Sequence, residues 1–203
     1  MKSLVFLLAL LPVGLTEWKA ISGELSANLI KDITEETGIW TLRFILLTLA
    51  ITPLRKISGW APVARFRRMI GLFAFFYGSL HFFTYIYLDQ FFAFDEILQD
   101  VAKRPFITVG FAAFSIMIPL ALSSPNFIAK WMSGKKWKLL HRLVYLTALG
   151  GVIHYLWLVK ADRQRPLIYG ALLAALLGYR LWDYLRSRRP THKPIPGGKA
   201  NLA

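Results

Sequence analysis

The chain has 203 residues, of which 56% are hydrophobic and 18% charged, and its mean hydropathy of +0.46 is high for a soluble domain. The sequence contains no cysteine, which excludes disulfides, iron–sulfur clusters, thiol catalysis and the covalent attachment of a c-type heme. Its formal net charge is +14, which in a soluble protein would suggest nucleic-acid binding, so the position of that charge along the chain has to decide between nucleic acid and membrane.

Six apolar segments follow one another along the chain: 3–18, 40–54, 69–88, 105–124, 139–159 and 166–182. The last four are long enough for a helix to cross a bilayer, which takes about 20 residues. The first is shorter and contains Pro12 behind Lys2, so it is either a retained helix or the core of a signal peptide. The segments predict an all-α integral membrane bundle of six transmembrane helices, which forms one domain over 1–185 and ends in a disordered basic tail, 186–203.

The connections between these segments carry opposite charges on the two sides of the membrane. Loops 55–68 and 125–138 hold five and four basic residues and no acid, whereas loops 19–39 and 89–104 hold four acids each. The positive-inside rule places the basic loops and both termini in the cytoplasm, with the acidic loops on the outer face. Ten of the eleven acids then lie on the outer side, with Asp183 as the exception. The positive charge is a stripe beside membrane spans, which anionic lipid explains better than nucleic acid does.

Three of the four histidines lie in apolar segments, where polar groups are costly and usually functional. His81 and His154 lie toward the outer ends of two different helices, at comparable depth. His141 lies at the cytoplasmic end of its segment, ~19.5 Å from His154 along a helix axis and about 140° around it. For both to face one neighbour the helix must bend, and Gly150–Gly151 is the expected place. His192 lies in the polar tail and is given no role.

Two imidazoles that face each other inside a helix bundle suit a heme iron, because the porphyrin supplies the other four nitrogen ligands. Zinc or di-iron sites need more ligands than these histidines offer, and no acid or cysteine lies at their depth. The aromatic stretches "FAFFYGSLHFFTYIY" and "HYLW" suit a flat apolar ring, and Gly78, Gly150 and Gly151 leave room for it. The residues therefore predict His81 and His154 as the axial ligands of one b-type heme. The alternative is an ordinary hydrogen bond between two membrane helices.

Several arginines lie close to the ends of the apolar segments. Arg43, Arg142 and Arg180 are each within about a turn of a segment end, where long cationic side chains extend to the interface. Arg142 or Arg68 is the candidate contact for heme propionates on the inner side.

Residues 30–183 resemble the heme-binding membrane subunit of the bacterial periplasmic methionine-sulfoxide reductase system, the YedZ/MsrQ family. The stretches that carry the resemblance are "TGIWTLRFILLTLAITPLRK", "RFRRMIGLFAFFYGSLHFFTY", "KRPFITVG", "LHRLVYLTALGGVIHYLWLVK" and "PLIYG". The resemblance implies a place in the wider ferric-reductase transmembrane group, location in the bacterial inner membrane and b-type heme held by His81, His141 and His154. That group often carries four ligands, but the position thirteen residues before His81 is Arg68, so a second heme stays open.

The same resemblance implies a function. Electrons would pass from the quinol pool or a cytoplasmic flavin reductase to a periplasmic molybdopterin reductase that repairs oxidised methionines, and FMN is associated with the family. The chain would then be the electron-transfer subunit and not the catalytic one. Three alternatives stay open: a membrane anchor without a redox role, a ferric-reductase-like heme protein with another acceptor, and a transporter with a histidine proton relay. The absence of acids from the five apolar segments after the first weakens the last of these.

Overall fold

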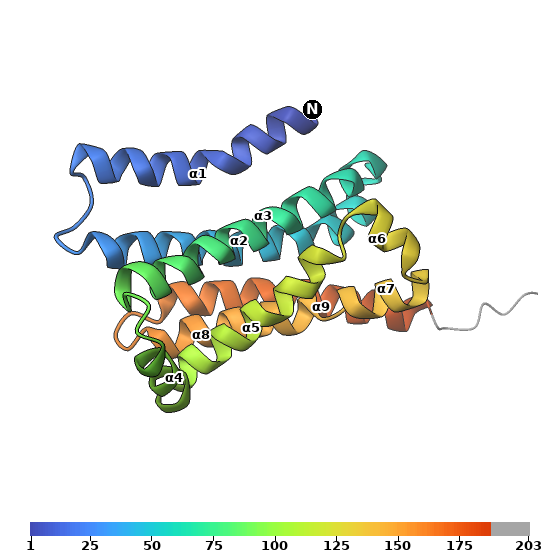
Figure 1. Cartoon of the computed structure of the whole chain (residues 1–203). Coiled ribbons are helices and arrows are strands. Elements are labelled where there is room, and N and C mark those ends of the chain that lie inside the picture. The colour runs from blue at the N-terminus through green and yellow to red at the C-terminus, as the bar shows by residue number, and fades with distance from the viewer. Residues whose placement is uncertain (188–203) are drawn as a thin grey trace, which may run out of the picture.

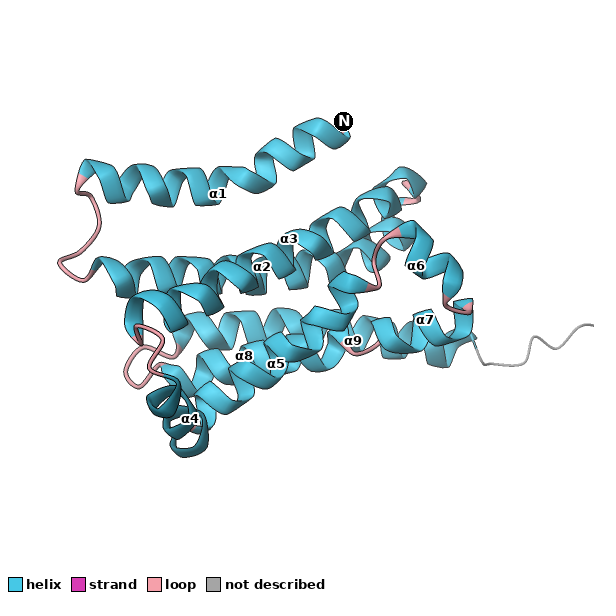
Figure 2. Ribbon diagram, in the orientation of Figure 1, coloured by secondary structure: helices cyan, strands magenta, loops and turns pink. Residues whose placement is uncertain are grey.

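The computed structural model describes residues 1–187, and every regular element in that range is helical (Figures 1 and 2). The six long helices are α1 (Lys2–Ser22), α2 (Leu29–Ser58), α3 (Arg67–Phe83), α5 (Pro105–Leu122), α8 (Val144–Leu158) and α9 (Gln164–Ser187). The short ones are η1 (Ala61–Phe66), η2 (Thr84–Asp89), α4 (Phe94–Lys103), α6 (Asn126–Trp131) and α7 (Gly134–His141). The predicted all-α class is confirmed for this range. The disordered tail predicted for 186–203 starts too early, because α9 continues through residues 186 and 187. The rest of the predicted tail, with His192, lies outside the described residues.

Five stretches are long and apolar enough to cross a membrane: Lys2–Ser22, Leu29–Ser58, Ala61–Asp89, Pro105–Leu122 and Gly134–Leu158. The predicted sixth segment, 166–182, forms most of α9, but α9 also carries Arg180 and Asp183 near its end. These charges lower its apolar character, and α9 is not among the five. These five candidate crossings indicate a multi-pass membrane protein.

Several helices are longer than the apolar segments from which they were predicted. Segment 40–54 is the middle of α2, a helix of 30 residues. This helix begins inside the expected loop 19–39 because the Asn28 side chain caps it, accepting a hydrogen bond from the Lys31 N–H at 3.1 Å. It ends at Gly59, whose φ of 69° is left-handed. A helix, once formed, propagates through polar residues, so hydropathy marks only its membrane-embedded part.

The other expected loops also contain helices. Loop 89–104 includes α4, and loop 125–138 includes α6 and the start of α7. The predicted continuous helix 139–159 is two helices, α7 and α8, separated at Arg142–Leu143, where the backbone N–H groups bond three residues back. The bend expected at Gly150–Gly151 is therefore wrong, because α8 runs unbroken across these glycines. They allow close helix contact instead: a Cβ at Gly150 would lie 3.1 Å from the Ala113 Cβ of α5.

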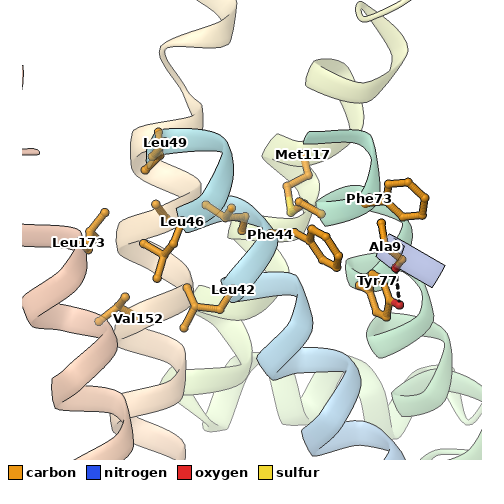
Figure 3. Close-up of a cluster of buried hydrophobic side chains, with 13 residues drawn as sticks. Ala9, Leu42, Phe44, Leu46, Leu49, Phe73, Tyr77, Met117, Val152 and Leu173 are labelled. Atoms are coloured by element: carbon orange, nitrogen blue, oxygen red, sulfur yellow. Dashed lines mark hydrogen bonds between the residues drawn. The ribbon is translucent and has the colours of Figure 1, made fainter. Parts of the chain in front are cut away.

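The hydrophobic core lies around α2 (Figure 3). Leu42, Leu46 and Leu49 face α8 and α9, where Val152 and Leu173 are buried. On the other side of α2, three aromatic rings stack in a row, since the Phe44 ring lies 5.8 Å from that of Phe73 and 5.1 Å from that of Tyr77. This core joins α2, α3, α8 and α9 into one bundle, and α5 packs against α3 and α8.

Tyr77 on α3 connects α1 to this bundle through two hydrogen bonds. Its hydroxyl donates to the Ala9 carbonyl oxygen at 2.9 Å (Figure 3). The same hydroxyl accepts from the Val13 N–H at 3.1 Å. In a regular helix these two groups would bond each other, so the hydroxyl is inserted into the hydrogen-bond ladder of α1. The insertion lies next to Pro12, which has no N–H of its own and already weakens the ladder there.

We expect Tyr77→Phe to loosen α1 while leaving the aromatic stack intact. The substitution removes two buried hydrogen bonds, which costs about 0.5–1.5 kcal/mol of stability, and it allows α1 to regain its own ladder. Thermal unfolding in detergent and limited proteolysis of the segment between α1 and α2 measure the effect. The control is Tyr87→Phe, at a half-exposed tyrosine. Equal stability and equal cleavage in the two variants would contradict the role of Tyr77.

Candidate functional site

The structure brings His81 of α3 and His154 of α8 together. Their ring centroids are 6.0 Å apart, and their planes make an angle of 82°. The two residues come from helices that do not follow one another in the chain, and their proximity is what matched depth in the membrane predicted.

Each of the two rings is held by one backbone carbonyl. The Nδ1 of His81 lies 2.9 Å from the Thr34 carbonyl oxygen of α2, and the Nδ1 of His154 lies 2.7 Å from the Phe106 carbonyl oxygen of α5. A carbonyl oxygen only accepts, so Nδ1 carries the proton in both rings. The Nε2 atom of each neutral ring then keeps a free lone pair. Metal-binding histidines in proteins are arranged in this way, with the second ring nitrogen donating to a carbonyl or carboxylate.

Two glycines lie directly against these rings. A Cβ added at Gly38 of α2 would lie 3.0 Å from the Cε1 and Nδ1 atoms of His81, and one added at Gly110 of α5 would lie 2.6 Å from the Nδ1 of His154. Sequence reasoning missed both glycines. The pairing of a glycine with a histidine on another helix depends on how the helices are rotated. The only signal in the sequence is a helix-weakening glycine inside segment 105–124 and another just before segment 40–54.

The glycines predicted to leave room for a ring pack against other helices instead. A Cβ at Gly78 would lie 3.4 Å from the Thr41 Cγ2 atom, and one at Gly151 would lie 3.4 Å from the Leu42 Cδ1 atom. Together with Gly150 they allow helix to pack on helix, and they do not border the histidine rings.

One aromatic ring of α5 lies near the pair, and two more aromatic rings stack between α3 and α5. The Phe106 ring lies 6.2 Å from that of His154, and the Phe82 ring stacks on that of Phe114 at 4.6 Å. At the usual metal–nitrogen distance of about 2.0 Å, two imidazoles on opposite sides of one iron have centroids roughly 6 Å apart, close to the 6.0 Å seen here. Within residues 1–187 no three His, Cys, Asp or Glu side chains form a metal-binding group. The site therefore fits an iron that brings its other ligands with it, as heme does.

His141 lies apart from the pair. It ends α7, where its ring stacks on that of Trp137 at 3.9 Å and its Nδ1 lies 3.1 Å from the Trp137 carbonyl oxygen. Arg68 is exposed and donates to the Asn126 side chain, and Arg142 is exposed as well. Arg68 lies ~19.5 Å along the axis of α3 from His81, and Arg142 lies at the junction of α7 and α8, before the helix that carries His154. The structure brings none of these three residues to His81 and His154.

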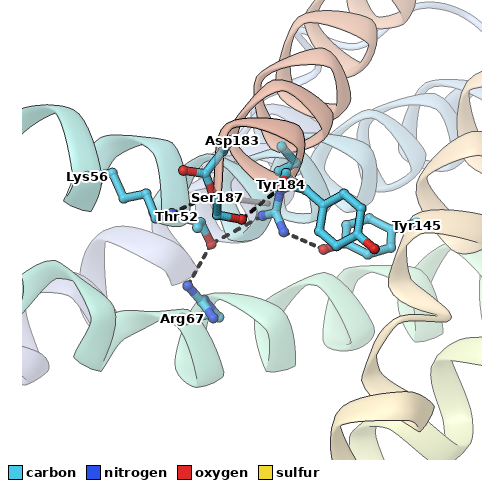
Figure 4. Close-up of polar contacts among 8 residues, drawn as sticks. Thr52, Lys56, Arg67, Tyr145, Asp183, Tyr184 and Ser187 are labelled. Atoms are coloured by element: carbon cyan, nitrogen blue, oxygen red, sulfur yellow. Dashed lines mark hydrogen bonds and ion pairs between the residues drawn. The ribbon is translucent and has the colours of Figure 1, made fainter. Parts of the chain in front are cut away.

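A second polar cluster lies at the end of the bundle where α2 and α9 finish (Figure 4). Arg180 donates to the Tyr145 hydroxyl at 2.5 Å and to the Leu49 carbonyl oxygen at 2.6 Å. This carbonyl is free because Pro53, four residues later, has no N–H to donate to it. The prediction that Arg180 extends to the interface is therefore wrong: the freed carbonyl and the tyrosine hydroxyl draw it inward.

Two further charged side chains also bond to groups on other helices. Arg43 also turns inward, donating from Nε to the Tyr169 hydroxyl at 2.9 Å. Asp183, the exception to the charge asymmetry, lies 2.5 Å from the Lys56 ammonium group and so ties the end of α9 to the end of α2 (Figure 4).

The sequence has clear relatives. Residues 37–152 match the family described as ferric reductase like transmembrane component. The chain is 51% identical over 183 residues to a protein of Herminiimonas arsenicoxydans, covering 89% of this chain and 84% of that protein. It is 50% identical over 190 residues to one of Azospira oryzae (93% and 82% covered) and 46% identical over 198 residues to one of Xanthomonas euvesicatoria (94% and 89%). All three are named protein-methionine-sulfoxide reductase heme-binding subunit MsrQ. No solved structure matches the chain.

Proposed function

The chain belongs to the ferric reductase-like transmembrane family and, within it, to the MsrQ heme-binding subunits, and from this membership we propose that it carries electrons across the bacterial inner membrane through a b-type heme held by His81 and His154. The observation that carries the proposal is the pair itself: two imidazoles on two helices, each with Nδ1 bonded to a carbonyl and Nε2 free. When bound, heme supplies one-electron redox chemistry.

The residues around the pair would suit it to electron transfer. Held by both His81 and His154, a heme would supply one-electron transfer rather than oxygen binding. The Thr34 and Phe106 carbonyls fix the ring orientation and make each Nε2 a stronger ligand. Phe106 beside His154 would help to exclude water, which affects the reduction potential.

The electron donor and acceptor follow from the relatives' names and from the resemblance. The relatives are heme-binding subunits of a methionine-sulfoxide reductase, so the proposed acceptor is the catalytic subunit, a periplasmic molybdopterin enzyme that repairs oxidised methionines. The proposed donor is the quinol pool or a cytoplasmic flavin reductase, and FMN belongs to the proposal on the resemblance alone. The chain would be the electron-transfer subunit and carry no catalytic residue.

This function is tested with the purified chain in lipid vesicles. Quinol should reduce the heme, and adding the methionine-sulfoxide reductase together with a methionine sulfoxide should reoxidise it. A colourless chain that still binds the reductase would contradict the proposal and favour a membrane anchor. Reoxidation by ferric iron but not by the reductase would favour a ferric-reductase-like protein with another acceptor.

We propose α9 as the sixth crossing and 1–185 as one transmembrane domain that keeps α1. The 24 residues of α9 span about 36 Å, which exceeds the ~30 Å of hydrocarbon. The Lys56–Asp183 and Arg180–Leu49 contacts hold its last turns at the end of α2 that leads into the basic segment 55–68. Figure 1 places the N-terminus at that same end, together with α6 and α7, and α4 at the opposite one.

The proposed orientation puts both termini in the cytoplasm, because basic segments near membrane spans stay inside. A fluorescent protein that folds only in the cytoplasm, fused after residue 187, should therefore be bright. Alkaline phosphatase inserted at the same place should be inactive, and inserted into the acidic segment 89–104 it should be active. An active phosphatase after residue 187 would refute the orientation.

We expect His141→Ala to leave the His81–His154 heme in place. His141 ends α7, whereas His154 lies near the far end of α8, and the His141 ring stacks on that of Trp137. Heme content and the low-spin spectrum should match the wild type when measured at equal protein levels. Loss of all heme would show that matched depth has selected the wrong pair, and loss of half would reveal a second, inner heme.

A further inference from the structure

We propose that Gly38 and Gly110 are positioning residues that set the planes of the His81 and His154 rings and, through them, the electronic state of the heme. This inference rests on the proposed function, since it concerns the iron that the two histidines would share. It adds two residues that touch neither iron nor porphyrin and act only through the imidazoles.

The same arrangement occurs on two different helices: a carbonyl that accepts from a histidine ring, with a glycine four residues later. The carbonyl that receives the His81 Nδ1–H belongs to Thr34, and Gly38 follows it by four residues on α2. The carbonyl that receives the His154 Nδ1–H belongs to Phe106, and Gly110 follows it by four residues on α5. Residues four apart lie above one another on one helix face. Each ring therefore lies over a glycine while its Nδ1–H reaches the carbonyl on the same face.

A carbonyl oxygen has two lone pairs, and this explains why the fourth residue has to be glycine. In a regular helix one lone pair accepts the N–H four residues later, here that of the glycine, and the other faces the imidazole. At Thr34 the Thr37 hydroxyl, 3.1 Å away, donates to the same oxygen as well. A side chain on the fourth residue would stand where the ring lies. The contact is tighter at Gly110, where a Cβ would be 2.6 Å from the His154 ring, than at Gly38, where it would be 3.0 Å from the His81 ring.

Other helical glycines do not show this closeness to a functional ring. A Cβ at Gly71 would lie 3.7 Å from the Thr48 side chain, and one at Gly170 would lie 3.5 Å from that of Val152. These are ordinary van der Waals contacts, so alanine fits at both positions. Gly71 and Gly170 are therefore matched controls in membrane helices of the same bundle.

The glycines have an electronic consequence because they hold the rings nearly perpendicular, at 82°. When the planes of two axial imidazoles are perpendicular, two d orbitals of low-spin ferric iron are nearly equal in energy. Such an iron gives a single strongly shifted EPR feature, whereas parallel planes give a rhombic spectrum with three features. Turning either ring thus changes both the EPR spectrum and the reduction potential.

The test compares Gly38→Ala and Gly110→Ala with Gly71→Ala and Gly170→Ala in the full-length heme-loaded protein. The readouts are heme per protein, the ferric EPR spectrum and the midpoint potential. Gly110→Ala should weaken heme binding by roughly 10–100-fold, as loss of a support to a metal-bound histidine does, and change the EPR spectrum. Gly38→Ala should keep most heme but shift the EPR feature and the potential. Both controls should match the wild type, and since alanine favours a helix over glycine, helix weakening cannot explain a loss.

Two results would overturn the inference: a rhombic spectrum for the wild type, or wild-type EPR spectra and potentials for both Gly38→Ala and Gly110→Ala. If the Gly110→Ala protein does not accumulate in the membrane, the Gly38→Ala variant alone tests the inference. Its Cβ displaces the histidine ring less, so this variant should still fold. The His81→Ala and His154→Ala variants separate this inference from the proposed function. If they lose heme while the glycine variants are unchanged, only the positioning role is refuted, whereas heme of wild-type spectrum in both histidine variants refutes the site itself.

Discussion

Replacing either His81 or His154 with alanine is expected to remove the low-spin heme or to convert it to a five-coordinate form, with heme content falling at least ~10-fold. The two Nε2 atoms are the proposed axial ligands, and the described residues place no other His, and the sequence no Cys, beside them. Electron delivery to the acceptor should stop in both variants. Heme quantitation and absorption spectra of membranes at equal protein levels measure the change.

A matched control and a rescue sharpen this first prediction. His141→Ala should keep the wild-type spectrum, because its ring stacks on Trp137. Added imidazole should restore a six-coordinate spectrum to His81→Ala or His154→Ala by binding in the vacated space. A wild-type low-spin spectrum in both alanine variants without imidazole would rule the pair out as ligands.

The second large effect is expected from Arg180, whose removal leaves the Leu49 carbonyl and the Tyr145 hydroxyl without their donor. Each buried group left unsatisfied costs about 1–3 kcal/mol, while bonds between membrane helices are often weaker, about 0.6 kcal/mol. Arg180→Met, which keeps the apolar length of the side chain, should therefore lower the free energy of unfolding by about 2–3 kcal/mol. Unfolding in mixed micelles measures this value.

Pro53 provides the decisive partner for a double-mutant cycle. Pro53→Ala restores an N–H that can bond the Leu49 carbonyl, so the double variant should regain about 1 kcal/mol relative to Arg180→Met alone. The control is Arg186→Met, which removes an exposed arginine stacked 5.3 Å from the Trp182 ring centroid and should cost under about 0.5 kcal/mol. Strict additivity of Arg180→Met and Pro53→Ala would mean that the freed carbonyl does not explain the position of Arg180.

The histidine pair was predictable because depth in a membrane can be read from sequence. The lengths of the apolar segments and the basic loops beside them place His81 and His154 at the same level, and in the structure their rings are 6.0 Å apart. The all-helical class followed from the same pattern, since a bilayer leaves no other structure for apolar segments of this length.

Rotation about the helix axes was not predictable in this way. Gly38 and Gly110 border the histidine rings only because of how α2 and α5 are turned and which neighbours they meet, and hydropathy carries no information on either. Arg180 illustrates the same limit. Pro53 signals a free carbonyl in the sequence, but only the packing of α9 against α2 identifies the side chain that bonds it. Polar helix ends, such as the start of α2 at Leu29, depend on capping residues rather than on apolar length.

The most direct test of a bis-histidine electron carrier is the absorption spectrum of the purified wild-type chain, oxidised and then reduced, with carbon monoxide added at the end. Because His81 and His154 fill both axial positions in this account, the spectrum should be that of a single low-spin six-coordinate b-type heme. It should change on reduction and then stay unchanged by carbon monoxide, which finds no open site on the iron. A colourless protein, or a reduced heme that binds carbon monoxide at once, would contradict it.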